Sequence, residues 1–386
     1  MPKMLNYRAL REQYDAAPAH CCRELGEAIE GRQLAAADFS IRELAEAFLG
    51  EDVVRAMEPR RKSGGMRLLE AASAVDTTAF SNITGQIIFS KVKEQFELAT
   101  MISEQLCSTE QTTFLLGEKT PGVGGIGDEA EVVDEAQPYP TVGVSEEYVE
   151  TPALKKRGFI VPVTREIIVA DRTNVVLKQC GDTAKWLGLN KEKRVLDTCF
   201  GVTNSYKRNG TSTNTYLSSG AYINTVTGNA LVDWTDLENA WLAFDALTDP
   251  NTGEPIGADL MGRPLTVVVP SALLWTAKRV FNASEIRFGD GATGTTATYG
   301  ANPLSGAGFS IVSSPYVRAR TGSPSTWFVG DFKNAFVYRE AWGVETQQAP
   351  TNSTAEFERD IKMQFKVSEM GAPGVLEPRR VLKITA

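Results

Sequence analysis

Apolar residues recur at helical spacing early in the chain. The clearest case is "FSIRELAEAFLG", in which Ile41, Leu44 and Phe48 fall on one face of a predicted helix. Ser40, followed three residues later by Glu43, predicts a capping box at its start. The neighbouring sequence offers no evident partner for this apolar face. We therefore expect it to dock on the longest helix of the chain or on another molecule.

A second helical pattern spans about Thr77 to Leu98, and the longest spans about Asn174 to Phe200. At 1.5 Å per residue, the longest helix measures roughly 40 Å. Its predicted buried stripe is expected to pack on the C-terminal strands, and its lysines are expected to face solvent or the inside of an assembly. The stripe holds Val176, Cys180, Ala184, Leu187, Val195 and Cys199, and the lysines are Lys178, Lys185 and Lys191.

Between Ala130 and Val163 the pattern is extended instead of helical. The outer part, "EAEVVDEA" and "PTVGVSEEYVETP", is polar and acidic, and "LKKRGFIVPV" returns as an apolar strand. A lone hairpin is marginal in water, and this one is too polar to build a core of its own. The sequence therefore predicts an arm that is ordered by another molecule, with candidate contacts at Asp134, Glu135, Glu146, Glu147 and Tyr148.

The remainder reads as an α/β module followed by long strands. Within 201–342, "WTDLENAWLAFDAL" predicts a helix capped by Thr235 and Glu238, and "RPLTVVVP" predicts a buried strand with Ser271 capping the next helix. The stretch from Arg287 to Gly308 is rich in Gly and Thr, and is predicted to be a long loop. Near the C-terminus, alternating apolar residues up to Val367 predict a strand that "GAPG" turns back, before a last strand in "RRVLKITA".

Composition and charge argue against several functions. The 386 residues carry a net charge of −8, which is unlike a dedicated nucleic-acid reader. The single histidine, His20, and five scattered cysteines without a C-x-x-C pair do not suggest acid–base catalysis, a zinc site or a disulfide framework. No apolar run suits a membrane helix or a secretion signal, so we expect no membrane contact and a cytoplasmic setting.

One stretch imitates a dinucleotide-binding motif. Gly122, Gly124 and Gly127 form a literal G-x-G-x-x-G. A Rossmann fingerprint needs a strand before the glycines and a helix after them. Here acidic residues follow the glycines, and Pro138 and Pro140 exclude a helix soon after. We therefore expect no cofactor at these glycines.

The order of these parts resembles the major capsid proteins of tailed bacteriophages, the Hong Kong 97 type fold. The resemblance rests on "AEVVDEAQPYPTVGV" through "GFIVPVTREIIVADR", "LTVVVPSALLWTAKRV", "TWFVGDFKNAFVYRE" and "FERDIKMQFKVSEMGAPGVLEPRRVLKIT", and covers about Thr112 to Ala386. It implies an α+β subunit with an N-terminal arm (1–111), an E-loop hairpin (112–162), a P-domain with a long spine helix (163–200 and 343–386) and an inserted A-domain (201–342).

The resemblance also implies a function without catalysis. Such subunits self-assemble as hexamers and pentamers into an icosahedral head shell that encloses double-stranded DNA without reading its sequence. The implied partners are other copies of the chain, a portal protein, and scaffolding or cement proteins, with assembly in the host bacterial cytoplasm and a final place in the virion. Contacts at Ile41, Leu44 and Phe48 and along the acidic arm would join the copies.

Two alternatives stay open. An encapsulin, a bacterial nanocompartment shell of the same fold, would enclose cargo enzymes instead of DNA. An enzyme with a nucleotide loop at 122–127 would bind a nicotinamide cofactor or ATP. The covalent cross-link between a Lys and an Asn found in some phage capsids is not expected, since "FERDIKMQFKVSEM" lacks Asn.

Overall fold

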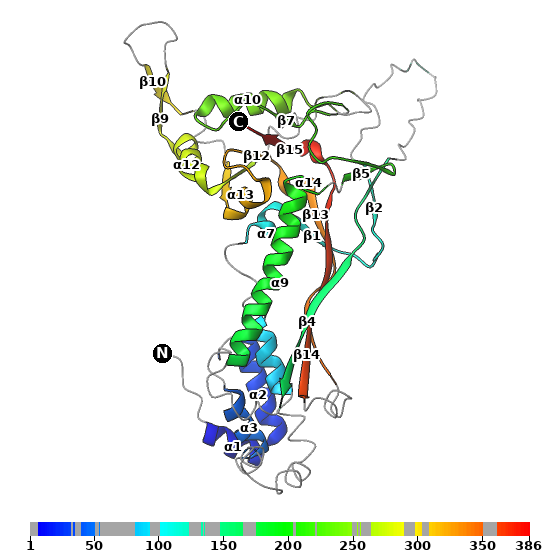
Figure 1. The fold of residues 1–386 in the computed structure, drawn as a ribbon, viewed down its shortest axis with the longest axis vertical. Helices are drawn as coiled ribbons and strands as arrows, with labels where there is room; N and C mark the ends of the chain where they lie inside the picture. The colour runs from blue at the N-terminus through cyan, green and yellow to red at the C-terminus, as the bar shows by residue number, and fades with distance from the viewer. Residues whose placement is uncertain are drawn as a thin grey trace. The chain divides into compact units, whose positions relative to one another are not determined.

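The structure is a computed structural model, shown in Figure 1. The residues it describes are 7–31, 34, 40–50, 54, 82–92, 101–122, 133, 135, 147–164, 175–203, 206–220, 222–248, 253, 255, 264–288, 298–302, 309–349 and 361–386.

The chain forms two compact units. The first comprises Met1–Ala99, Lys156–Asn190 and Trp342–Met370, and the second comprises Thr100–Lys155, Lys191–Ala341 and Gly371–Ala386. The division falls inside α9 (Val175–Cys199), β13 (Phe336–Gln348) and β14 (Ile361–Val375), and it separates Lys155 from the rest of β4 (Lys155–Thr164).

The first unit is built on helices packed against strands. It contains α1 (Tyr7–Ala16), α2 (Pro18–Glu30), α3 (Ile41–Leu49), a helix over 82–92 and nearly all of β4 (Lys155–Thr164). Its core joins these helices to the first half of α9 and to β14. Buried members of that core include Leu44, Phe48, Ile87, Val163, Cys180, Ala184, Phe365 and Val367. The predicted packing of the longest helix on the C-terminal strands is therefore confirmed. Phe357, which the alternating pattern also assigns to that contact, lies outside the described residues.

A five-stranded sheet is the centre of the second unit. Its strand order is β11-β8-β12-β15-β7, so the last strand in the sequence is an interior strand of the sheet. The strands are β7 (Thr225–Val226), β8 (Thr266–Val269), β11 (Ser310–Ser313), β12 (Trp327–Gly330) and β15 (Val381–Ile384).

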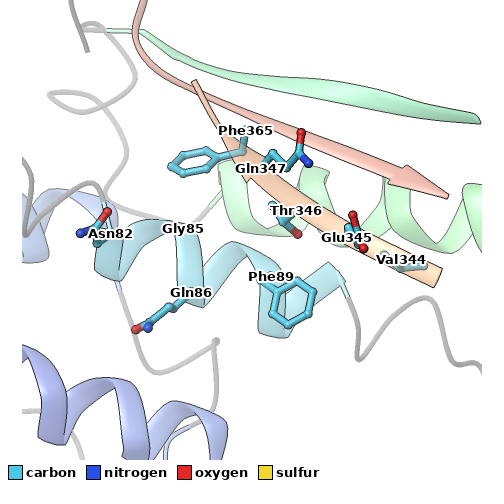
Figure 2. A pocket seen from close by; sticks show the side chains of 9 residues that line it. All are labelled: Asn82, Gly85, Gln86, Phe89, Val344, Glu345, Thr346, Gln347 and Phe365. Atoms are coloured by element: carbon cyan, nitrogen blue, oxygen red, sulfur yellow. The ribbon is translucent and has the colours of Figure 1, made fainter. Parts of the chain in front are cut away.

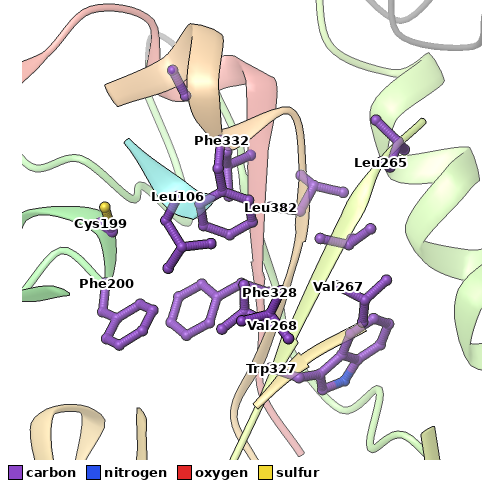
Figure 3. Packing of buried hydrophobic residues seen from close by; sticks show 14 of the residues in the cluster. Leu106, Cys199, Phe200, Leu265, Val267, Val268, Trp327, Phe328, Phe332 and Leu382 are labelled. Atoms are coloured by element: carbon purple, nitrogen blue, oxygen red, sulfur yellow. The ribbon is translucent and has the colours of Figure 1, made fainter. Parts of the chain in front are cut away.

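Aromatic side chains fill the core of the second unit, as Figure 3 shows. Phe200, just after α9, stacks on Phe328 of β12 with ring centroids 4.9 Å apart. Trp327 is fully buried, and its indole N–H donates to the Asn229 carbonyl at 3.1 Å. Each large ring buries much apolar area, and the indole N–H is satisfied, so this core is both apolar and hydrogen-bonded.

The second unit also contains helices, one whole four-stranded sheet and part of another. A second, four-stranded sheet has the order β2-β3-β5-β6, and β1 pairs in parallel with β13, in a sheet of order β1-β13-β14-β4. The helices are α7 (Ser103–Leu106), α10 (Trp234–Asp245), α12 (Leu274–Asn282), α13 (Pro315–Thr321) and α14 (Phe332–Ala335). The strands are β1 (Ser108–Gln111), β2 (Lys119–Pro121), β3 (Tyr148–Glu150), β5 (Tyr206–Arg208) and β6 (Thr211–Thr213).

Three predicted helix starts differ in the structure. Ser40 precedes α3 without a side-chain cap, and its N–H donates to the Tyr7 hydroxyl at 3.1 Å instead. The capping box of α10 is formed by Asp233 and Asp236, two residues before the predicted pair. Ser271 opens a 3₁₀ turn ahead of α12 and makes no side-chain cap.

Two predictions about irregular segments were wrong. The predicted turn at "GAPG" is absent, because β14 continues through Gly371 and Gly374 to Val375. A side chain at Gly371 would overlap the Tyr338 ring, so these glycines allow close packing along the strand. The glycine- and threonine-rich stretch after Arg287 is not wholly a loop, since β9 (Glu285–Phe288) pairs antiparallel with β10 (Thr298–Ala301).

Candidate assembly surfaces

The apolar face of α3 is covered by the subunit itself. Ile41, Leu44 and Phe48 are each 1 % exposed, and the Phe48 ring meets the Tyr14 ring of α1 edge-on at 4.8 Å. Arg11 of α1 donates to the Ala47 carbonyl at 2.9 Å. In the isolated chain this face therefore contacts α1, and a contact with a neighbouring subunit stays a prediction.

The acidic arm is anchored at its base by strand pairing. β2 pairs antiparallel with β3, with Lys119 opposite Glu150 and Pro121 opposite Tyr148. Most of the chain between these strands, including Asp134 and Glu146, lies outside the described residues. Glu135 is described and exposed. The paired strands β2 and β3 therefore hold both ends of the arm against the second unit.

Charged and polar contacts lock this base to the adjacent β5. Glu147 is buried and forms an ion pair with Arg208. The Tyr148 N–H donates to the Asn209 side chain at 3.0 Å, and the Nζ atom of Lys119 lies 4.1 Å above the Tyr148 ring. Glu147 and Tyr148, which the sequence suggested as contacts between copies, are thus engaged within their own chain.

Glu150 adds a third tie at the base. Its carboxylate accepts from Lys207 at 2.5 Å and lies 3.8 Å from Lys119. The hydrogen bond from Lys207, aided by both positive charges, lowers the pKa of Glu150. The arm's base is therefore held partly by ionised groups.

The glycine-rich stretch begins in this base and has a packing role there. The Gly122 N–H donates to the Glu147 carbonyl at 2.9 Å. A Cβ atom at Gly122 would lie 2.5 Å from the Glu147 Cγ, too close for any side chain. Gly124 and Gly127 lie outside the described residues. Gly122 therefore lets the chain after β2 lie close to Glu147, just before β3.

Sequence reasoning missed an exposed apolar tip that lies just before β2. Phe114, Leu115 and Leu116 are 63 %, 46 % and 92 % exposed. Gly117, at φ +99°, turns the chain behind them, and the Thr151 hydroxyl and backbone hold Glu118 through bonds of 2.9–3.1 Å. The sequence did contain a sign of this tip, because three consecutive apolar residues stand there outside any periodic pattern and are followed by Gly.

A basic surface on β4 and β14 was also missed. Lys156 is exposed, Lys366 is half-buried, and both line a hollow of about 210 Å³ beside Gly158 and the exposed Ile160. A Cβ at Gly158 would overlap the Val367 carbonyl oxygen, so the glycine lets the two strands approach. The sequence shows Lys155, Lys156 and Arg157 together, but Lys366 joins them only through strand pairing.

A larger groove lies between the 82–92 helix and β13. Its volume is about 690 Å³, and Figure 2 shows Phe89 of the helix and Val344 to Gln347 of β13 around it. Phe89 is 37 % exposed, whereas Phe365, at the groove's other wall, is fully buried. The groove is open and contains Glu345 as its only charged lining residue among those described.

The thiols and the histidine lack an activated setting. Burial raises the pKa of Cys180 to about 12 and that of Cys199 well above its usual value. His20 is exposed and lies 3.5 Å from Glu24 on the same helix. In the part of the chain that the structure describes, no group of three His, Cys, Asp or Glu side chains is placed to hold a metal. Nor does any described helix have the length and apolarity needed to cross a bilayer.

The described residues form an α+β fold with an anchored arm base and with exposed apolar and basic surfaces. Residues 147–384 match the model of a family described as phage capsid protein. This match covers more than half of the chain, and the chain belongs to that family. This membership confirms the resemblance to major capsid proteins of the Hong Kong 97 type and the α+β fold class that it implied. Family membership also makes the chain a structural, non-enzymatic protein of the capsid shell.

Several solved capsids are similar to the chain at low identity. The capsid of cyanophage P-SCSP1u is 15 % identical, covers 74 % of this chain and 88 % of its own, and has a TM-score of 0.47. The capsid of an empty GTA particle is 11 % identical, with coverages of 75 % and 91 % and a TM-score of 0.46. A chain from the solved structure of Gordonia phage Cozz is 14 % identical, with coverages of 75 % and 88 % and a TM-score of 0.45. No curated protein matches the chain.

Proposed function

We propose that this protein is the major head subunit of a tailed bacteriophage, and that it assembles as hexamers and pentamers into an icosahedral shell around double-stranded DNA. The match of residues 147–384 to the phage capsid family carries this proposal. The portal protein is a further partner, as are scaffolding or cement proteins. Assembly takes place in the host bacterial cytoplasm.

The proposed division of labour follows the domains expected from the sequence. The N-terminal arm (1–111) and the E-loop hairpin (112–162) contact neighbouring subunits. The P-domain (163–200 and 343–386) and the A-domain (201–342) form the body of the subunit. The net charge of −8 is consistent with a wall that encloses DNA without gripping it.

The arm itself is the proposed assembly element. Its base is ordered within the subunit, whereas its outer part, with Asp134, Glu135 and Glu146, is proposed to lie on a neighbouring copy. The apolar face at Ile41, Leu44 and Phe48 is proposed to support assembly by holding the N-terminal helices in place, since it is buried in its own chain.

Electron microscopy of the purified protein tests the proposal. Icosahedral shells, or rings of five and six subunits, are expected, and a stable monomer at high concentration would contradict it. A variant in which residues 134–146 are replaced by a short Gly-Ser linker keeps Glu147 and its Arg208 pair. That variant should melt like the wild type as a free subunit and should fail to form shells.

The contents of the purified particles distinguish a phage head from a nanocompartment. Particles purified from phage-infected cells should contain DNA protected from nuclease. Particles filled with one enzyme and lacking protected DNA would instead identify an encapsulin.

A further inference from the structure

The charges of this chain are separated along its sequence at the E-loop. Between Pro121 and Leu154 there are eight carboxylates and no Lys, Arg or His. Their sum of −8 equals the net charge of the entire chain. The next three residues are Lys155, Lys156 and Arg157. An acidic arm is therefore followed at once by a basic strand.

The described residues show what the basic strand presents. Alternation along β4 leaves Lys156, Gly158 and Ile160 exposed, while Phe159 and Val161 pack against the core of the first unit. Lys366 of the adjacent β14 lines the same hollow of about 210 Å³. Figure 1 shows β4 and β14 side by side. The surface is thus a hollow lined by the cationic side chains of Lys156, Arg157 and Lys366. Of its apolar lining residues, Ile160 is 60 % exposed.

We infer that this hollow on β4 and β14 receives the acidic E-loop of a second copy of the chain. The inference rests on the proposed function, because it names the surface on which the arm docks. Charge complementarity selects the occupant, since ammonium groups attract a segment that carries only carboxylates. The exposed Ile160 suits an occupant with apolar side chains between its acids, such as "EVVDE" at 131–135, better than a phosphate backbone.

The two complementary surfaces are different parts of one chain. A contact between unlike surfaces of identical subunits is heterologous, and such contacts close into rings when the rotation between subunits allows it. Arm-to-hollow pairing repeated around an axis would therefore join the subunits of a capsomer. Because the pairs are exposed, salt weakens them, and the screening length falls from about 8 Å at 0.15 M to about 3 Å at 1 M.

Charge reversal with rescue tests the inference. Lys156→Glu with Lys366→Glu should lower the yield of shells and rings by about tenfold or more, since like charges then face each other. Adding Asp134→Lys and Glu135→Lys should restore the yield. Two controls isolate position from net charge. Lys178→Glu with Lys185→Glu, both exposed on α9, should assemble normally, and Glu238→Lys with Asp245→Lys, exposed on α10, should not rescue.

Melting of each unassembled variant shows whether it folds. Should the double Glu variant fail to fold, Lys156→Gln with Lys366→Gln replaces it. A smaller loss of yield is then expected, and Asp134→Lys with Glu135→Lys should not restore it, because a neutral amide does not attract an ammonium group. Normal assembly of a folded reversed variant overturns the inference, as does rescue by the α10 control. Normal shells that contain less DNA would identify phosphate as the occupant and overturn it too. A wild type that never assembles would instead defeat the proposed function, and the inference with it.

Discussion

The Nζ atom of Lys191 on α9 lies 3.5 Å from Oε1 of Glu340 on β13. The two side chains are only 23 % and 16 % exposed, and the ammonium group also lies 4.5 Å above the Tyr338 ring. The expectation that Lys191 faces solvent with Lys178 and Lys185 was therefore wrong. At 100° per residue, positions 178 and 185 share a face, but position 191 is about 120° away from position 185 and about 140° away from position 178.

Lys191→Ala should lower the free energy of unfolding by about 1–2 kcal/mol, because it leaves the half-buried Glu340 carboxylate without its partner. Lys185→Ala, at an exposed position on the same helix, is the matched control and should melt like the wild type. Denaturant unfolding of the free subunits compares them. Equal stability of the two variants would show that the pair contributes nothing.

Leu44→Ala should destabilise the unassembled subunit by about 2–5 kcal/mol, because a fully buried leucine leaves a cavity between α3 and its neighbours. Glu43→Ala, next to it but exposed, should change little. A Leu44 variant that melts normally yet fails to assemble would instead show that this face acts only between subunits.

Asn224 is a buried polar side chain that connects several backbone segments and that the sequence did not single out. It is fully buried, and its amide donates to the carbonyls of Thr215 and Pro378 at 3.0 and 2.9 Å and accepts from the Leu217 N–H at 2.8 Å. Asn224→Ala should cost about 2 kcal/mol or more, since buried backbone groups lose their partners. Asn282→Ala, at an exposed helix end, should cost little by the same unfolding measurement.

The base of the E-loop should be acid-sensitive. Because the folded pKa of Glu150 is lowered by Lys207, its contribution to stability is fully present above its ordinary pKa near 4.5. The contribution is lost as the pH falls below that value through the folded pKa. Unfolding measured between about pH 6 and pH 3 should therefore show a smaller loss of stability in Glu150→Gln than in the wild type. Parallel curves for the two proteins would contradict the ion pair.

Thiol labelling should follow burial. Burial raises the pKa of the thiols of Cys22, Cys180 and Cys199, but Cys22 is only half-buried, whereas the other two are buried. Iodoacetamide at pH 8 should therefore modify Cys22 well before Cys180 or Cys199, as mass spectrometry of the native subunit can measure. Rapid modification of Cys199 would mean that the core around Phe200 opens readily.

Periodic patterns predicted the helices and strands that bury one face and expose the other. Ile41, Leu44 and Phe48 gave α3, and the apolar runs gave β4, β8 and β15, because burial on one face dictates which residues are apolar. The caps at Ser40 and Thr235 were wrong, because several nearby oxygens compete to accept the first N–H groups of a helix, and tertiary contacts decide among them. The "GAPG" segment remained extended because Tyr338 needs the space that Gly371 leaves.

The candidate surfaces were harder to predict than the fold. Lys366 stands far from Lys156 in the sequence, and only the strand order of the sheet brings them to one hollow. Glu147 looked like any other acid of the arm, but pairing with Arg208 depends on how β3 meets β5. Surface chemistry of this kind is set by which strands are neighbours, and a single sequence contains little information about that.

The interior position of β15 has a consequence for synthesis on the ribosome. Residues 381–384 pair with β12 on one side and β7 on the other, and Leu382 and Ile384 are fully buried. The second unit therefore cannot complete its main sheet until those residues have left the ribosome. A chain interrupted shortly before that strand would leave the inner edge of β12 open and its core exposed. Such a chain is a target for proteolysis, because its unpaired core strands stay accessible to a protease.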